Sequence, residues 1–246
     1  MSYDEEIEKE RHLFQEEGRK YQRLVELGRR VHQPVIVPLW NLKITTAGGG
    51  VRVNRDSYGH SFTRNLYNAH TQYSLFRRVS AHNTPIPDTY AEGGLGLKRI
   101  TGSVLTSGFR ATLFPEPNAA GGGYGIPAAD TSYGFVAGTG VTAESFDDFV
   151  VQGLIAHGAG AGQLSYAIGT LSKAFDGGDR FKSAQWGRAL TNSSGDTISV
   201  GNVCMYFKDS AGVYAFVREV LGPPQDVLDT EVLTFTYEFR MYFPEV

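Results

Sequence analysis

The C-terminal segment is the feature that most constrains how this chain can fold. Between Leu233 and Phe243, apolar and polar side chains alternate with a strict period of two. Successive side chains of a β-strand point to opposite faces, so this pattern predicts one long strand. One face of it must be buried. The residues expected on that face are Leu233, Phe235, Tyr237, Phe239, Met241 and Phe243.

Other extended segments accompany this strand. Residues 35–45 and 51–59 flank the glycine turn AGGG, and residues 197–207 and 212–221 flank KDSAG, which predicts a hairpin. The apolar parity changes at Gly201-Asn202, which predicts a β-bulge there. Strands and turns without a regular strand–helix alternation predict a mainly β protein, an antiparallel β-sandwich.

The N-terminal region is predicted to be a charged helical arm over residues 1–31, with the β-sandwich domain over residues 32–246. Ile7, Phe14 and Tyr21 recur every seven residues, and Leu24 extends this narrow apolar seam. Such a seam suits helix pairing better than the filling of a core. We therefore expect these four side chains to contact a neighbouring subunit, with a solvated helix on its own domain as the alternative.

Residues 61–78 depart from the β pattern. Their apolar side chains recur near helical spacing after Ser61, which predicts one short internal helix. Residues 83–98 and 115–134 are rich in Gly, Pro, Asn and Ala and are predicted to be long loops. Tyr124 and Tyr133 in the second loop are candidate ligand-facing aromatics, because exposed tyrosine rings can stack on sugars.

The sequence HGAGAGQLSY, residues 157–166, looks at first like a phosphate-binding loop. A dinucleotide fingerprint needs a third glycine and a following helix, but Gln163 occupies that place and a strand pattern follows. We predict a β-turn between strands 149–156 and 163–171, and no nucleotide cofactor.

The sequence shows no pattern typical of a catalytic or metal-binding site either. Asp147 and Asp148 are adjacent, so in a strand they would point to opposite faces, and we expect them to end a turn. The six histidines show no short metal-ligand spacing, and Cys204 is a single cysteine in an apolar strand. We predict no catalytic, cofactor or metal site, and hence no enzyme.

The composition and charge of the chain limit the kinds of partner that it can be expected to bind. The formal net charge is −3 with a sequence pI near 6.1, which does not favour nucleic acid. No apolar run approaches the length of a membrane span or signal peptide. We expect synthesis in a reducing cytosol and no membrane partner.

Four phrases occur in order along the second half: Gly138–Thr142, Arg188–Val200, Arg218–Leu221 and Leu233–Tyr237. This order resembles a pattern in virion proteins of tailed phages and prophages, where a GTG-T-A segment precedes an R-x-x-T-N-x-S-G-x-x-I-x-V strand, a hairpin and a terminal strand. The resemblance covers residues 136–241, and SFTRNLYNA upstream looks like a segment that often precedes this block. The N-terminal helix and GPPQD depart from the pattern.

The resemblance implies a structural subunit whose activity is assembly. It would associate with copies of itself and with other virion proteins in a tail, tube or capsid, after synthesis in the host cytoplasm. The alternative is a β-sandwich module that binds carbohydrate or attaches a particle to a surface.

Overall fold

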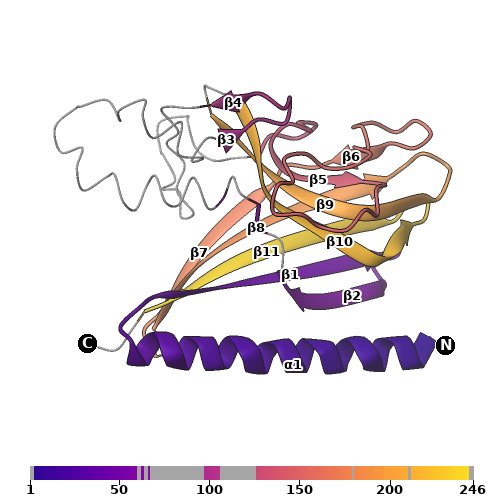
Figure 1. Ribbon diagram of the computed structural model, residues 1–246. Coiled ribbons are helices and arrows are strands. Elements are labelled where there is room, and N and C mark those ends of the chain that lie inside the picture. The colour runs from indigo at the N-terminus through magenta and orange to yellow at the C-terminus, as the bar shows by residue number, and fades with distance from the viewer. Residues whose placement is uncertain are drawn as a thin grey trace.

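The computed structural model describes residues 3–59, 62, 63, 66, 97–105, 126–178, 180–209 and 212–243 (Figure 1). These residues form a mainly β protein with one long helix at the N-terminal end, as predicted. The elements are α1 (Tyr3–Arg30), β1 (Val35–Thr45), β2 (Val51–Tyr58), β3 (Leu97–Lys98), β4 (Val104–Leu105), β5 (Gly134–Gly138), β6 (Leu164–Tyr166), β7 (Thr170–Asp176), β8 (Phe181–Asn192), β9 (Ile198–Asp209), β10 (Gly212–Val227) and β11 (Val232–Tyr242).

The larger sheet has the order β2-β1-β11-β8-β6, and β7 pairs with the first half of β8. All of its neighbouring strands are antiparallel. The predicted C-terminal strand lies in the middle of this sheet. Leu233, Phe235, Tyr237 and Phe239 are almost fully buried on one face, which confirms the predicted burial for these four residues. Met241 and Phe243 are only partly buried, and Phe243 lies just beyond the end of β11.

The smaller sheet, β10-β9-β5, packs on that face and completes the sandwich. Phe135 of β5 meets Phe235 of β11 edge to face at 5.1 Å, and Phe207 of β9 meets Trp186 of β8 at 6.2 Å. Rings of this size contribute about 1.5–3 kcal/mol each when fully buried. These contacts join the two sheets into one core.

Strand β9 is buried on both faces from Gly201 to Phe207. The segment 139–153 covers its second face, where the hydroxyl of Tyr206 accepts from the amide of Val151 at 2.8 Å and the side chain of Asn202 donates to the carbonyl of Gly140 at 2.9 Å. The predicted irregularity does fall at Gly201, but the extra residues lie in the partner strand between Val220 and Gln225. The register between β9 and β10 thus shifts between Val200 and Asn202, where the sequence predicted an irregularity.

Helix α1 runs along the outer face of the larger sheet, below β1 and β2 in Figure 1. At its end, the amide of Gln33 donates to the carbonyl of Gly28 (2.8 Å), and the amide of His32 donates to the carbonyl of Arg29 (3.3 Å). This is a Schellman arrangement, in which His32 takes the left-handed conformation (φ 54°). The turn reverses the chain, so that β1 runs back along the helix. Within the described residues, no helix is long and apolar enough to cross a membrane.

Three predicted segments differ from the structure or lie outside it. The predicted strand 163–171 is interrupted between β6 and β7, because Gly169 bonds to the carbonyl of Ile126 and leaves the ladder. Residues 149–156 form no named strand and pair with β5 only through isolated bonds. The predicted helix 61–78 and the loops 83–98 and 115–134 lie mostly outside the described residues, although Leu66 is helical and Leu97–Lys98 is strand β3.

Candidate interaction surfaces

The seat of α1 on the sheet is a cluster of three aromatic rings. Tyr58 is the last residue of β2 and faces outward, where its ring stacks on Phe14 at 5.0 Å and on Tyr21 at 4.7 Å. The Tyr21 hydroxyl donates to the carbonyl oxygen of Gly59 at 3.1 Å, and Val25 is buried one turn further along. The helix is thus held mainly through one narrow line of side chains.

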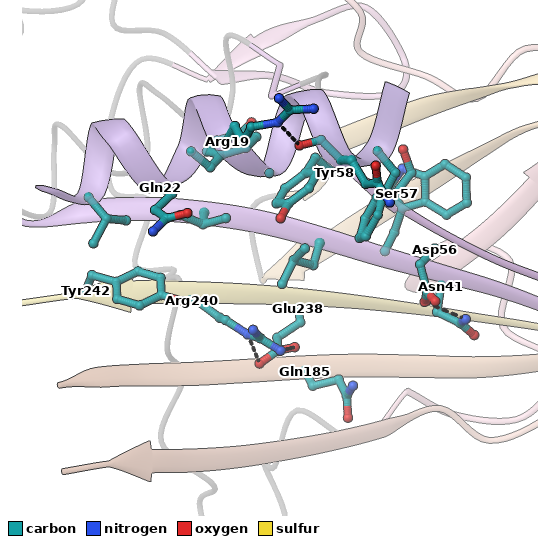
Figure 2. Close-up of a pocket in the computed structure, with 18 of the residues that line it drawn as sticks. Arg19, Gln22, Asn41, Asp56, Ser57, Tyr58, Gln185, Glu238, Arg240 and Tyr242 are labelled. Carbon is teal, nitrogen blue, oxygen red and sulfur yellow. Dashed lines mark hydrogen bonds and ion pairs between the residues drawn. The ribbon is translucent and has the colours of Figure 1, made fainter. Parts of the chain in front are cut away.

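Beside this seat, a groove of about 930 Å³ lies between α1 and the outer face of the sheet (Figure 2). Its floor includes Arg240, which makes two bonds of 2.9 and 3.0 Å to the carboxylate of Glu238. Those bonds raise the pKa of Arg240. Asn41 donates to Asp56 at 2.8 Å, and Gln185 projects from β8. The groove therefore combines polar groups that are held in fixed orientations with apolar and aromatic side chains such as Val25 and Leu39.

A flank of α1 faces away from this groove and is apolar. Leu24, Leu27 and Val31 lie about one turn apart and are 48%, 54% and 53% exposed. The structure thus divides the predicted arm residues into two groups. Phe14 and Tyr21 pack on their own domain, and Leu24 lies on the exposed flank. Ile7 lies in the helix, but its side chain is outside the description. Their contact with a neighbouring subunit stays a prediction.

The sequence did not identify Tyr58 as the partner of the arm. The available signal was its place in β2, where Asn54, Asp56 and Tyr58 share the outer face and only Tyr58 is aromatic. A single ring at the end of a polar strand face could have been matched with the aromatic seam of the helix.

The loop end of the sandwich is organised by Arg188, the first residue of the R-x-x-T-N phrase. Its side chain is buried on the inner face of β8, and its planar guanidinium lies 4.9 Å from the ring centre of Tyr166. Burial lowers the pKa of Arg188 and raises that of Tyr166 to about 12. The guanidinium donates to five backbone carbonyls, at 2.7–3.1 Å, of Pro127, Asp130, Tyr133, Phe135 and Ala167.

Arg218 holds the segment 139–153 in a similar way on the outer face of the smaller sheet. Its fully buried side chain bonds the carboxylate of Asp148 at 2.7 Å and the carbonyl of Thr142 at 2.8 Å. Asp148 also accepts from the amide of Ser145 at 2.9 Å, which confirms the predicted turn. Asp147 is exposed and its amide bonds to Ser145, so the two aspartates have separate roles in this turn.

Asn192 is the third fixed point of the phrase. Its amide group donates to the carbonyls of Asp196 and Val227 at 2.7 and 2.8 Å, and its oxygen accepts from the amide and hydroxyl of Ser194. This buried side chain ties the β8–β9 turn to the end of β10. The phrase residues therefore specify how loops attach to the sandwich.

The glycine-rich segment 157–163 is a turn, as predicted. The Gln163 side chain accepts from the amide of Gly160 at 3.0 Å, and a Cβ on Gly158 would lie 2.0 Å from the same oxygen. His157 accepts from the amide of Tyr166 at 3.1 Å. These groups bond to their own chain, and strand β6 rather than a helix follows.

The remaining candidates occupy ordinary positions. Tyr133 is half-buried and supplies a carbonyl to Arg188, whereas Tyr124 lies outside the described residues. Cys204 is fully buried, and burial raises the pKa of its thiol. In the part of the chain that is described, no group of three His, Cys, Asp or Glu side chains is arranged to hold a metal ion.

Comparison of the chain with protein-family models, curated proteins and solved structures finds no match.

Proposed function

We propose that this protein is a non-enzymatic structural subunit that assembles into a phage virion or a related tail, tube or capsid. The observation that carries the proposal is the ordered set of phrases shared with tailed-phage virion proteins. Arg188, Asn192 and Arg218 in these phrases are buried side chains that fix loops to the sandwich. Shared phrases built on such residues support a shared scaffold, which makes the resemblance more than a likeness of composition.

The surfaces of the chain support the same proposal. A helix of 28 residues, about 42 Å long, lies outside the core and carries an apolar flank at Leu24 and Leu27, which Val31 continues just after the helix ends. Exposed apolar patches with polar surroundings are typical of protein–protein contacts. In a repeating assembly, modest contacts of this kind add up through multivalency.

Assembly of the purified protein tests the proposal. We expect rings, tubes or other regular particles by negative-stain imaging, and a mass that grows with concentration by light scattering. Deletion of residues 1–30 should impair assembly, because it removes the seam together with Leu24 and Leu27 of the flank. A protein that stays monomeric at high concentration, and whose behaviour the deletion does not change, would contradict the proposal.

A second candidate function is carbohydrate binding, and the polar groove beside α1 favours it. Amides and carboxylates such as those of Asn41, Gln185 and Asp56 are suited to hydrogen-bond sugar hydroxyls. A glycan array tests this function directly. Binding that is lost in Gln185→Ala and kept in Tyr133→Ala would assign it to the groove, and the reverse result would assign it to the loop.

A further inference from the structure

The seat of α1 is made by side chains that every copy of the chain carries. Phe14 and Tyr21 stack on Tyr58 at 5.0 and 4.7 Å. A Cβ atom on Gly18 would lie 2.9 Å from the Tyr58 hydroxyl, so the helix approaches this ring closely. Because α1 fits this surface on its own sheet, it fits the same surface on a second copy equally well.

The core of the sandwich is built without α1. The buried cluster that joins the two sheets begins at Trp40 and includes none of the described residues of the helix. Within the described part of α1, Val25 is the one buried apolar side chain. Figure 1 shows the helix outside both sheets. The helix can therefore leave its seat while the sheets keep their own contacts.

The turn that returns the chain from α1 to β1 is short and strained. It consists of residues 31–34, and His32 adopts a φ of 54° at a position where helices usually carry glycine. Pro34 keeps Gln33 before it extended, so the reversal of the chain depends on His32. Short connections under strain favour exchange of the element that they connect.

An exposed apolar flank lies beside this turn. Leu24 and Leu27 fall in the last two turns of α1, Val31 lies just after it, and each is about half exposed. The four residues of the turn span at most about 14 Å when extended. If α1 of one copy docks on a second copy, its end lies beside the start of the second copy's β1, and the first copy's β1 must begin within that span. The two turns then meet, and they bring the two flanks together.

We propose, on the basis of the assembly function proposed above, that two copies exchange α1. The helix of each docks on Tyr58 of the other, and the flanks meet at a two-fold axis beside the turns. The contacts of the seat are the same in the exchanged pair. An extended connection needs no left-handed residue, so the strain at His32 is relieved, and burial of the flanks is added. The amides of His32 and Gln33, which close the turn, belong to exposed residues and can bond to water instead.

This exchange gives the predicted arm residues a common role. Phe14 and Tyr21 contact the partner's sheet, and Leu24 contacts the partner's flank. Exchange requires that two chains meet, so the closed monomer is favoured at low concentration and the exchanged pair at high concentration.

Deletion of His32 and Gln33 separates exchange from docking within one chain, because the two predict opposite results. Pro34 would then follow Val31 directly, so the chain would leave the helix extended and could not reverse. With exchange, we expect the dissociation constant to fall by at least about tenfold, because the closed monomer no longer competes. Analytical ultracentrifugation measures it. A rise in the dissociation constant would overturn the proposal, since it would mean that association needs the arm on its own sheet.

A longer turn is the second variant. Insertion of Gly-Ser-Gly between His32 and Gln33 lets the turn close without strain, so we expect the dissociation constant to rise about tenfold. The control places the same insertion between Gly48 and Gly49, in the exposed turn between β1 and β2, and should change the constant by less than about twofold. Equal effects of the two insertions would refute the exchange. Matching melting temperatures show that the variants are folded.

A cysteine in the flank tests the two-fold contact. Cys204 is fully buried, so a new surface cysteine is the one thiol available for mild oxidation. We expect Val31→Cys to form a covalent dimer. The matched control is Gln22→Cys, which lies on the groove side of the same helix. Cross-linking of the control to the same extent would show that the flanks do not meet at the axis.

The two proposals fail in different ways. If the deletion weakens association while the natural chain still forms particles, the exchange is refuted and the structural function stands. If the deletion strengthens association but imaging of the natural chain shows only dimers, the exchange stands and assembly into a particle is refuted. A natural chain that is monomeric at every concentration refutes both.

Discussion

The loop end of the sandwich and the seat of α1 are held by opposite kinds of contact. At the loop end, the buried guanidinium of Arg188 bonds five carbonyls from two separate segments, 127–135 and Ala167. At the seat, Phe14 and Tyr21 stack on one ring, Tyr58, beside a polar groove. Removal of a bonded buried charge disrupts everything that it holds, whereas removal of one stacked ring releases only its own element. The loop end should therefore unfold with the core, and the helix should detach without it.

The largest effect is expected from Arg188→Met, which keeps an apolar stem and removes all five donors. The carbonyls would be left buried without their partner, so we expect the free energy of unfolding to fall by about 3–5 kcal/mol. Urea denaturation measures it. The control is Arg23→Met, at an exposed position of α1, which should change the value by less than about 0.5 kcal/mol. A loss below about 1 kcal/mol for Arg188→Met would show that the loops do not depend on it.

A smaller and pH-dependent effect is expected at Glu231, whose carbonyl accepts from the amide of Asn192 just before β11 begins. Its carboxylate accepts from Arg52 at 2.7 and 2.6 Å and from the amide of Leu228 at 2.9 Å, and the bonds from Arg52 lower its pKa. A lowered pKa in the folded state means that the carboxylate stabilises the fold above its unfolded pKa. That contribution is lost as the pH falls through the folded pKa.

We therefore expect Glu231→Gln to lower the free energy of unfolding by about 1 kcal/mol at neutral pH. The difference from the natural chain should shrink as the pH falls through the folded-state pKa of Glu231. Denaturation curves at several pH values measure this convergence. Glu16→Gln is the control, because Glu16 pairs with Lys20 where both side chains are exposed to solvent. A difference between Glu231→Gln and the natural chain that does not depend on pH would contradict the role assigned to the charge.

A local effect is expected from Tyr58→Ala. Each stacked pair contributes about 0.5–1.5 kcal/mol, so the helix should open more often while the melting temperature of the sandwich stays nearly constant. Hydrogen exchange should show lost protection in residues 14–28 and unchanged protection in β9 and β11. Phe146→Ala, which removes a 47% exposed ring from a loop, is the control. A fall in core protection equal to that of the helix would show that the two regions unfold together.

The same contrast explains what the sequence predicted and what it did not. Alternation over Leu233–Phe243 and the turn at KDSAG predicted β11 and the β9–β10 hairpin, because local periodicity records which face is buried. Burial on both faces removes that record. Strand β9 is covered by segment 139–153 on its second face, so its apolar run from Val203 to Phe207 has no period of two that would show which face meets the other sheet.

Side-chain partners far apart in the sequence were the hardest to predict. Nothing local to Arg188 indicates that it would bond carbonyls more than 50 positions earlier, and nothing local to the arm indicates Tyr58. The seam of Phe14 and Tyr21 correctly identified a contacting face of the helix. Spacing alone could not distinguish the chain's own sheet from a neighbour as the surface in contact, since both present apolar side chains to the same seam.

The smallest expected effect concerns the turn that lets α1 fold back on its sheet. His32 adopts a φ of 54°, a conformation that costs a side-chain-bearing residue about 1 kcal/mol and that glycine adopts readily. Because glycine also loses more backbone entropy on folding, we expect a net gain of about 0.5 kcal/mol for His32→Gly, which would raise hydrogen-exchange protection of α1 about twofold. Gln33→Gly is the matched control, since Gln33 has no positive φ and glycine there adds only flexibility. Hydrogen-exchange protection of α1 that rises in His32→Gly and falls in Gln33→Gly would show that the turn at His32 is strained. That strain would favour detachment of α1, which the narrow contact at Tyr58 already permits.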